Sequence, residues 1–256
     1  IIEYKEFLSF ADSSIEKLSE IVDSLFNGDY YIIKNVIDEN FINDLKNKLI
    51  KKSHTTPSEF YKMYDGCPNY RREIDEDAAK KYSIKAVRNS FYFFRWNGDE
   101  MSLFEKFDPL WKIVKILGGL DKEEYVNNIP SDGVIDRIQV VKYPPLTGYI
   151  EPHHHNTTNQ KLMVSIYMSE KGKDYSQGGT YFYKNENGKD CEVEVESNIE
   201  TGDVGMFYGS LKHSVKAVEV DGINQDKEEL GRWWCGLYSP ESDHIENRRT
   251  SRPSSK

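Results

Sequence analysis

The sequence predicts a mainly β fold with flanking helices, an α+β arrangement. Between residues 134 and 240, short β-rich stretches alternate with turns that contain Gly, Pro and Asn, and this alternation is typical of sandwiches and barrels. Before residue 134, apolar side chains recur at helical spacing in several stretches. The length of 256 residues suits a single unit, because sandwiches and barrels often reach this size as one domain.

Composition and charge exclude several classes of protein. Aromatic residues make up 13% of the chain and hydrophobic residues 38%, whereas disordered chains are poor in such residues. The net charge of −9 counts against a nucleic-acid-binding protein, which normally carries a basic face. No apolar run is long enough to span a bilayer. We therefore expect neither a nucleic-acid partner nor a membrane partner.

The cysteines indicate the redox environment. Cys67, Cys191 and Cys235 show no CxxC spacing. An odd number of cysteines without that spacing disfavours a disulfide framework and suits a reducing compartment. We expect a cytoplasmic protein in which all three are ordinary thiols.

The first elements expected are two helices with a short strand between them. Residues 13–14 (Ser-Ser) precede apolar residues at helical spacing up to Leu25, and serine at that place caps helices. Residues 30–33 (Tyr-Tyr-Ile-Ile) form a short β-rich run. A second helix is predicted from residues 38–40 onward, with an apolar side that reaches Leu49.

The middle of the chain is predicted to hold one strand and one helix. Residues 51–86 are polar and contain a loop-like stretch at residues 64–69. Residues 90–96 form a strand that ends at Asn-Gly in positions 97–98. Residues 101–117 form a helix, which the glycines at 118–119 end.

A run of histidines at residues 152–155 (Pro-His-His-His) is the most informative motif, since strand-like stretches flank it on both sides. Alternate side chains of an extended chain point to the same side. His153 and His155 can therefore reach one ion while His154 points away. His213, which follows another strand-like stretch, can supply a third imidazole if the fold returns its strand beside the run. Three imidazoles can hold one face of a metal ion and leave the opposite face open.

The order and spacing of the motifs around these histidines resemble those of the Fe(II)/2-oxoglutarate-dependent oxygenase superfamily. The resemblance covers residues 29–50 weakly and residues 134–240 well. It implies a double-stranded β-helix, a jelly-roll or cupin-like barrel, with N-terminal helices packed on it. The residues that carry the resemblance are Tyr143, Gly148, the 152–155 run, the 162–168 strand, Gly178, Gly179, the stretch 202–207, His213 and Arg232.

On this resemblance we expect one oxygenase domain over residues 1–256. Residues 1–133 would form a helical N-terminal and lid region, residues 134–240 the jelly-roll core, and residues 241–256 a C-terminal tail. Residues 51–132 would cover the barrel mouth and select the substrate.

The resemblance implies that His153, His155 and His213 hold Fe(II), with one departure. The family usually has Asp or Glu where this chain has His155, so the site would be a three-histidine face resembling that of some cupin dioxygenases. Glu151, two positions before His153, could supply the missing carboxylate, and Asn156 could do so less readily. Imidazole binds Fe, Zn, Cu and Ni alike, so the ligand type leaves the metal open.

The resemblance also implies a site for 2-oxoglutarate. Arg232 fits the arginine that binds the distal carboxylate, because a planar guanidinium grips a carboxylate at two points. Tyr143 can donate a hydrogen bond to the same group. Arg232 lies farther beyond His213 than is usual, and residues 221–231 look like an inserted hairpin loop that restores the register. The family often has a hydroxyl where this chain has Trp234.

These features predict a non-haem iron oxygenase that hydroxylates or otherwise oxidises a small polar metabolite, using O2 and 2-oxoglutarate and releasing succinate and CO2. Gln139, Arg88 and Trp234 are weaker candidates for contacts with the substrate. Two alternatives remain open: a three-histidine, cupin-type dioxygenase that needs no 2-oxoglutarate, and a metal-binding barrel without catalytic activity. Succinate formation separates the first hypothesis from both alternatives.

Overall fold

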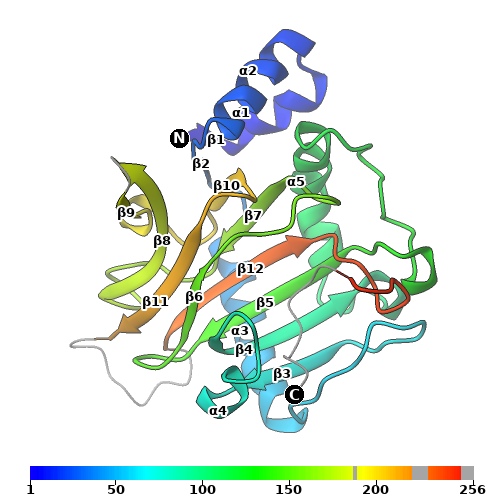
Figure 1. Ribbon diagram of the computed structural model, residues 1–256, viewed down its shortest axis with the longest axis vertical. Helices are drawn as coiled ribbons and strands as arrows, with labels where there is room; N and C mark the ends of the chain where they lie inside the picture. Colours follow the sequence, from blue (N-terminus) through cyan, green and yellow to red (C-terminus); the bar gives the residue numbers. More distant parts are fainter. Residues whose placement is uncertain (187–188, 221–229, 249–256) are drawn as a thin grey trace.

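The computed structural model describes residues 1–186, 189–220 and 230–248 (Figure 1). Within them the chain is mostly strand, with a few helices around one large mixed sheet. The predicted mainly β architecture with flanking helices is confirmed. Most of the loop predicted at 221–231 lies outside the described residues, which resume at residue 230.

The strands of the described residues are mostly short, as the turn-rich pattern after residue 134 predicts. They are β1 (Ile2–Glu3), β2 (Tyr31–Lys34), β3 (Tyr70–Ile74), β4 (Ala86–Phe94), β5 (Arg137–Tyr143), β6 (Tyr149–His153), β7 (Leu162–Tyr167), β8 (Gln177–Glu186), β9 (Lys189–Glu194), β10 (Val204–Tyr208), β11 (His213–Glu219) and β12 (Arg232–Tyr238).

The helices lie almost entirely in the first half of the chain. They are α1 (Tyr4–Leu8), α2 (Ile15–Phe26), α3 (Glu39–Thr55), α4 (Glu76–Ala79) and α5 (Leu103–Leu117). The predicted caps are present: Ser14 accepts a hydrogen bond from the Lys17 amide, and Asp38 accepts from the first amides of α3. Such side chains satisfy amides that have no partner within the helix.

The strands form two layers that are joined at β4. The major sheet runs β1-β2-β10-β7-β12-β5-β4, with β3 beside β4. The minor sheet consists of β6, β11, β8 and β9 in antiparallel pairs. The start of β4 pairs with β6 and the rest of β4 pairs with β5, so this strand belongs to both layers. Figure 1 shows the minor sheet in front of the major sheet and α3 behind it.

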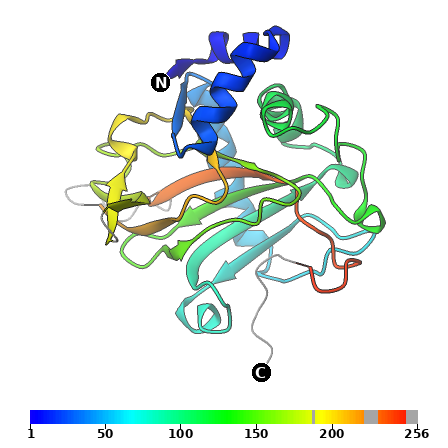
Figure 2. The same cartoon turned by 45° about the horizontal axis from the view of Figure 1, so that its top comes forward.

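The two faces of the major sheet have different roles. Phe91 and Phe93 of β4 are buried in the same core as side chains of α3 and α5. Figure 2 shows α3 passing behind the strands from a second direction. Alternate residues of β4, among them Arg88 and Tyr92, face the other way and line a cavity. This separation follows from the two-residue period of a strand.

The region before residue 134 contributes more to the sheet than its sequence predicted. Residues 70–74 form β3 and residues 76–79 form α4, in a stretch for which the sequence predicted no helix or strand. The predicted strand at 90–96 begins at Ala86 instead and is longer. The physical reason is that Arg72 of β3 and Arg88 of β4 interrupt the apolar residues on the cavity face, which hides the alternation of a half-buried strand.

No helix in the described part of the chain is long and apolar enough to cross a membrane.

Candidate metal centre and adjoining cavity

A cavity of about 340 Å³ is lined by side chains from both sheets. This volume lies within the usual range of pockets for small molecules. All the site residues singled out in the sequence line it, namely His153, His155, His213, Arg232, Tyr143, Gln139, Arg88 and Trp234. The fold thus brings together residues that are far apart in the chain.

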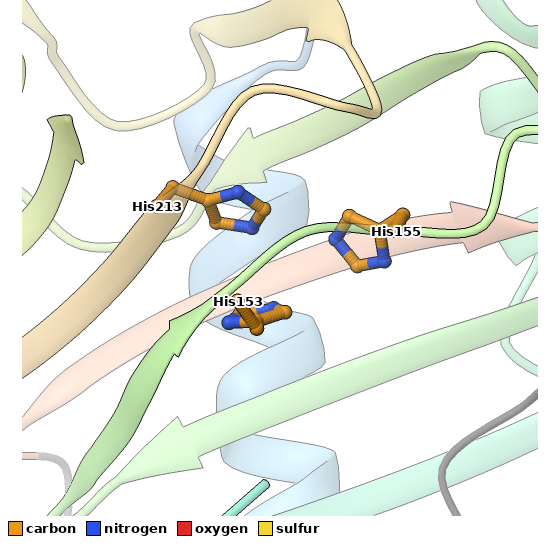
Figure 3. A group of neighbouring side chains, drawn as sticks. All are labelled: His153, His155 and His213. Carbon is orange, nitrogen blue, oxygen red and sulfur yellow. The ribbon is translucent and has the colours of Figure 1, made fainter. Parts of the chain in front are cut away.

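Three histidines converge at one end of this cavity (Figure 3). His153 is the last residue of β6, and His213, the first residue of β11, is its paired partner across the minor sheet. His155 follows in the segment after β6, where its backbone amide donates to the carbonyl of Gly209. One nitrogen from each ring lies within 4.8 Å of the others. This spacing is suited to ligands that share one metal ion.

Backbone carbonyls orient two of the three rings. The Nδ1 of His153 lies 2.8 Å from the carbonyl oxygen of Glu151, and the Nδ1 of His213 lies 2.9 Å from that of Leu211. A carbonyl oxygen can only accept, so each Nδ1 carries the proton and donates. The Nε2 lone pair of each ring is therefore left for a metal, which is the usual arrangement of a ligating histidine.

Burial keeps the three imidazoles neutral. Burial is the main reason that the pKa of His153 is lowered to about 4 and that of His213 to about 3, and neighbouring positive charge contributes to both shifts. The pKa of His155 is also well below its usual value, first through burial and then through the two other histidines. A neutral imidazole is the form that binds a metal, so no proton has to leave near pH 7.

His154 and Glu151 lie outside this cluster. His154 is exposed and is absent from the group of rings that could share an ion. The carboxylate of Glu151 accepts from the amide of Lys85 and pairs with its ammonium group at 3.4 Å. The side chain of Asn156 accepts a hydrogen bond from the amide of Thr158. None of these contacts favours Glu151 or Asn156 as the missing acidic ligand.

Arg232, the expected anchor for a carboxylate, already holds a carboxylate of the protein. Its Nε lies 2.9 Å and its Nη2 2.6 Å from Glu196 Oε1, and Nη2 also donates to Thr180 at 2.7 Å. Both Arg232 and Glu196 are almost completely buried. Burial raises the pKa of a carboxyl group, but Arg232 and further hydrogen bonds to Glu196 reverse this and hold its pKa below the usual value. The pair is therefore ionised and internally neutral.

One nitrogen of Arg232 has no partner. Nη1 is buried and makes no hydrogen bond within the described residues, although Arg232 lines the cavity. The rings of Tyr143 and Tyr167 flank the guanidinium at 5.7 and 5.5 Å. Arg232 thus offers one free donor rather than the two-point grip expected from the sequence.

The sequence did not single out Glu196. It lies in a short 3-10 turn after β9 and has no pattern around it. One indirect signal exists in the glycines at 178–179. A Cβ atom at Gly179 would overlap the Glu196 carboxylate, so a larger residue there would push Glu196 away from Arg232.

The remaining predicted residues, Tyr143, Gln139 and Trp234, also line the cavity. Tyr143 is buried and hydrogen-bonds to Arg88. The Gln139 amide lies 3.3 Å from the Ser90 hydroxyl, and its oxygen accepts from Arg137. The indole Nε1 of Trp234 is buried without a partner in the described residues.

Comparison with solved structures identifies the fold. Neither a family model nor a curated protein sequence matches the chain. A prolyl-4-hydroxylase from Pseudomonas putida superposes with a TM-score of 0.51 at 10% identity, over 87% of this chain and 97% of that chain. A Neurospora crassa protein crystallised in complex with α-ketoglutarate gives a TM-score of 0.52 at 14% identity, over 96% of this chain and 85% of that chain.

A third match is SnoK, a non-haem α-ketoglutarate-dependent carbocyclase from nogalamycin biosynthesis. Its TM-score is 0.50 at 12% identity, over 91% of this chain and 85% of that chain. The fold is the double-stranded β-helix of the Fe(II)/2-oxoglutarate-dependent oxygenases. At these identities the likeness is one of fold, and the three histidines lie within that fold at one end of its cavity.

Proposed function

We propose that this chain is an Fe(II)- and 2-oxoglutarate-dependent oxygenase that hydroxylates or otherwise oxidises a small polar metabolite. The observation that carries the proposal is the convergence of three neutral histidines in the cavity of an oxygenase fold. A fold alone does not establish an activity, but this cluster provides a site at which the chemistry can occur.

The residues fit a metal ion. His153, His155 and His213 would hold Fe(II) through their unprotonated nitrogens, and the open side of the cluster faces the cavity. Such a ligand set also accepts Zn or Ni, so the choice of iron rests on the fold. Bound Fe(II) together with 2-oxoglutarate would supply the oxidation of substrate by O2, with release of succinate and CO2.

The residues also fit 2-oxoglutarate, with a weaker anchor than expected. Arg232 lines the cavity, and its Nη1 is a buried donor without a partner in the described residues. Burying such a donor costs about 1–3 kcal/mol unless a ligand satisfies it. The distal carboxylate of 2-oxoglutarate would accept from this nitrogen. Tyr143, whose ring centre lies 5.7 Å from the Arg232 guanidinium, would donate to the same carboxylate.

The chain's own contribution would be to position and shield the reacting groups. Phe182 and Phe207 pack around His213, with ring centroids 5.5 and 5.0 Å from the imidazole. Tyr238 covers His155 at 5.9 Å. These rings exclude water from one side of the cluster, and a dry site strengthens every polar contact made there.

A second candidate is a three-histidine dioxygenase that needs no 2-oxoglutarate. The observation that favours it is the buried Glu196 carboxylate, which occupies two of the three guanidinium nitrogens of Arg232. A second carboxylate beside it would meet a cation that is already neutralised.

Product analysis separates these functions. The Fe(II)-loaded protein would be incubated with O2 and a panel of small metabolites, with and without 2-oxoglutarate, while O2 consumption and succinate are measured. Succinate formed only with 2-oxoglutarate supports the proposal. Oxygen consumption without 2-oxoglutarate supports the second candidate, and neither signal with any metabolite contradicts both.

A further inference from the structure

Three arginines besides Arg232 and Arg248 line the cavity. Arg72, Arg88 and Arg137 come from the adjacent strands β3, β4 and β5. We call these three residues the arginine cluster. Alternation along each strand turns them to the cavity face, whereas Phe91 and Ile138 on the opposite face are buried in the core.

Aromatic rings, rather than carboxylates, support the arginine cluster. The guanidinium of Arg137 lies 5.1 Å from the ring centre of Tyr92 and 5.3 Å from that of Tyr238. The guanidinium of Arg72 lies 4.3 Å from Phe60 and 5.1 Å from Tyr82. Stacking of this kind fixes the plane of a guanidinium and leaves its charge unpaired.

Two donors of the cluster have no hydrogen-bond partner in the described part of the chain. The Nε atoms of Arg88 and Arg137 are buried and have no hydrogen-bond partner within the described residues. Burying such charge-bearing donors without an acceptor is costly. The arrangement is therefore suited to a ligand that brings acceptor oxygens with it.

The charge of the side chains that line the cavity also favours an anionic ligand. Two further lining arginines are paired, Arg232 with Glu196 and Arg248 with Asp243. Among the described residues that line the cavity, Glu241 is the one with an acidic side chain. The cavity thus carries an excess of positive charge in a chain whose net charge is −9. Burial and the nearby charge of Arg88 lower the pKa of Arg72, which is a cost that a bound anion would remove.

We propose that the arginine cluster binds the substrate through a carboxylate or phosphate group, so that the substrate class is small organic anions. This inference deepens the proposed function, because it names the substrate class of the same site. Arginine forks match both kinds of anion in geometry and charge. Carboxylate and phosphate substrates share this chemistry, and the test below distinguishes them.

The cluster also sets where the anion lies relative to the histidines. Tyr238 contacts both the Arg137 guanidinium, at 5.3 Å, and the His155 ring, at 5.9 Å. A group held at Arg137 is therefore separated from His155 by about one aromatic side chain. The anionic end would be anchored there, and the rest of a small molecule would extend toward the metal-binding face.

Calorimetric titration of the metal-free full chain tests the proposal without depending on iron chemistry. The probes are inorganic phosphate, glutarate and glutaramide, the neutral diamide of glutarate. Glutarate lacks the keto oxygen with which 2-oxoglutarate would chelate a metal. We expect at least one anion to bind and the diamide not to bind. Tighter binding of phosphate would indicate phosphate substrates, and tighter binding of glutarate would indicate carboxylates.

Variants of the arginine cluster locate the binding site. Arg72→Gln, Arg88→Gln and Arg137→Gln are each expected to raise the Kd of the anion about tenfold or more, and Arg88→Lys should recover part of the loss. Arg71→Gln is the matched control, because Arg71 neighbours Arg72 but pairs with Glu73 and does not line the cavity. Its Kd should stay within about twofold.

Several results would overturn the inference. They are the absence of binding of either anion, equal binding of glutaramide, or a Kd that none of the three Arg→Gln variants changes. The last result would place the anion at Arg232 or on the surface. Failure of the proposed oxygenase function is a separate result, since cluster-dependent anion binding without succinate formation would leave this inference standing.

Discussion

Arg232 and Arg88 line the same cavity but differ in what balances their charge. The Nη2 atom of Arg232 lies 2.6 Å from Glu196 Oε1 and donates to Thr180 Oγ1 at 2.7 Å. Its Nη1 atom has no partner in the described residues. Arg88 contacts Tyr143 and has no carboxylate partner in the described residues. Arg232 thus serves mainly the stability of the fold. Arg88 keeps a charge without a carboxylate beside it, and on this contrast rests our proposal that the substrate anion binds at Arg88 and its neighbours rather than at Arg232.

The largest effect that we predict is on stability. Arg232→Leu should lower the free energy of unfolding by about 3–5 kcal/mol, because it leaves Glu196 buried without its counter-charge. Arg88→Leu should change it by less than about 1 kcal/mol, because no buried carboxylate loses a partner. Urea denaturation of both variants makes the comparison.

A double variant controls for lost packing. Arg232→Leu combined with Glu196→Leu should recover part of the stability, since a buried ion pair can be replaced by apolar groups at little cost. Equal destabilisation by the Arg232 and Arg88 single variants would remove the distinction between them.

The second prediction concerns pH and the inner end of the cavity. His153 and His213 have pKa values of about 4 and about 3, below the value of about 6.5 expected in the unfolded chain. The unfolded state therefore binds more protons below pH 6.5, so stability is present above that pH and is lost as the pH falls. We expect a loss of about 1 kcal/mol per histidine for each pH unit below 6.5 in metal-free protein.

Chemical denaturation between pH 7.5 and 5.5, in the presence of a chelator, measures this slope. A variant with both His153→Ala and His213→Ala should show a flatter dependence. If its slope equals that of the wild type, the two histidines are not the groups that titrate.

Metal affinity gives the third comparison, between clustered and exposed histidines. His153→Ala, His155→Ala and His213→Ala should each weaken Fe(II) binding about 100-fold or more, since even loss of a group that merely orients a ligand costs 10–100-fold. His154→Ala should leave the affinity within about threefold, because His154 is exposed and outside the cluster. Anaerobic titration with Fe(II) provides the Kd values, and loss of binding in His154→Ala with retention in His155→Ala would overturn the assignment.

The smallest effect is expected at Glu151. Glu151→Gln should leave Fe(II) affinity unchanged and alter stability by less than about 0.5 kcal/mol, because its partner Lys85 is half exposed. The same Fe(II) titration tests this. A tenfold loss of affinity would show that Glu151 turns toward the metal when iron binds.

Local patterns together with the family resemblance were sufficient to predict that the three histidines lie close together. Alternation places His153 and His155 on one side of a strand, and the position of His213 at the start of β11 follows from the Gly-Asp motif and the strand-like stretch before it. The α2 and α3 caps and the glycine end of α5 are equally local, so they too could be predicted.

The charge pairing inside the cavity could not be predicted. Glu196 lies in a short turn without periodicity, and its contact with Arg232 depends on the path of the chain past Gly179. The arginine cluster could not be predicted from the sequence for a similar reason. Strand pairing brings Arg72, Arg88 and Arg137 together from separate segments of the chain. A sequence pattern reports which face a residue lies on, but not which distant charge it meets.

The most direct test of the central claim is anaerobic titration of metal-free protein with Fe(II) and then with 2-oxoglutarate, while the visible spectrum is recorded. We predict a charge-transfer band on addition of 2-oxoglutarate, and in Arg232→Gln the concentration needed for half of that band should rise. Iron binding without any band would contradict 2-oxoglutarate as a ligand of the metal and would favour the three-histidine dioxygenase that acts without it.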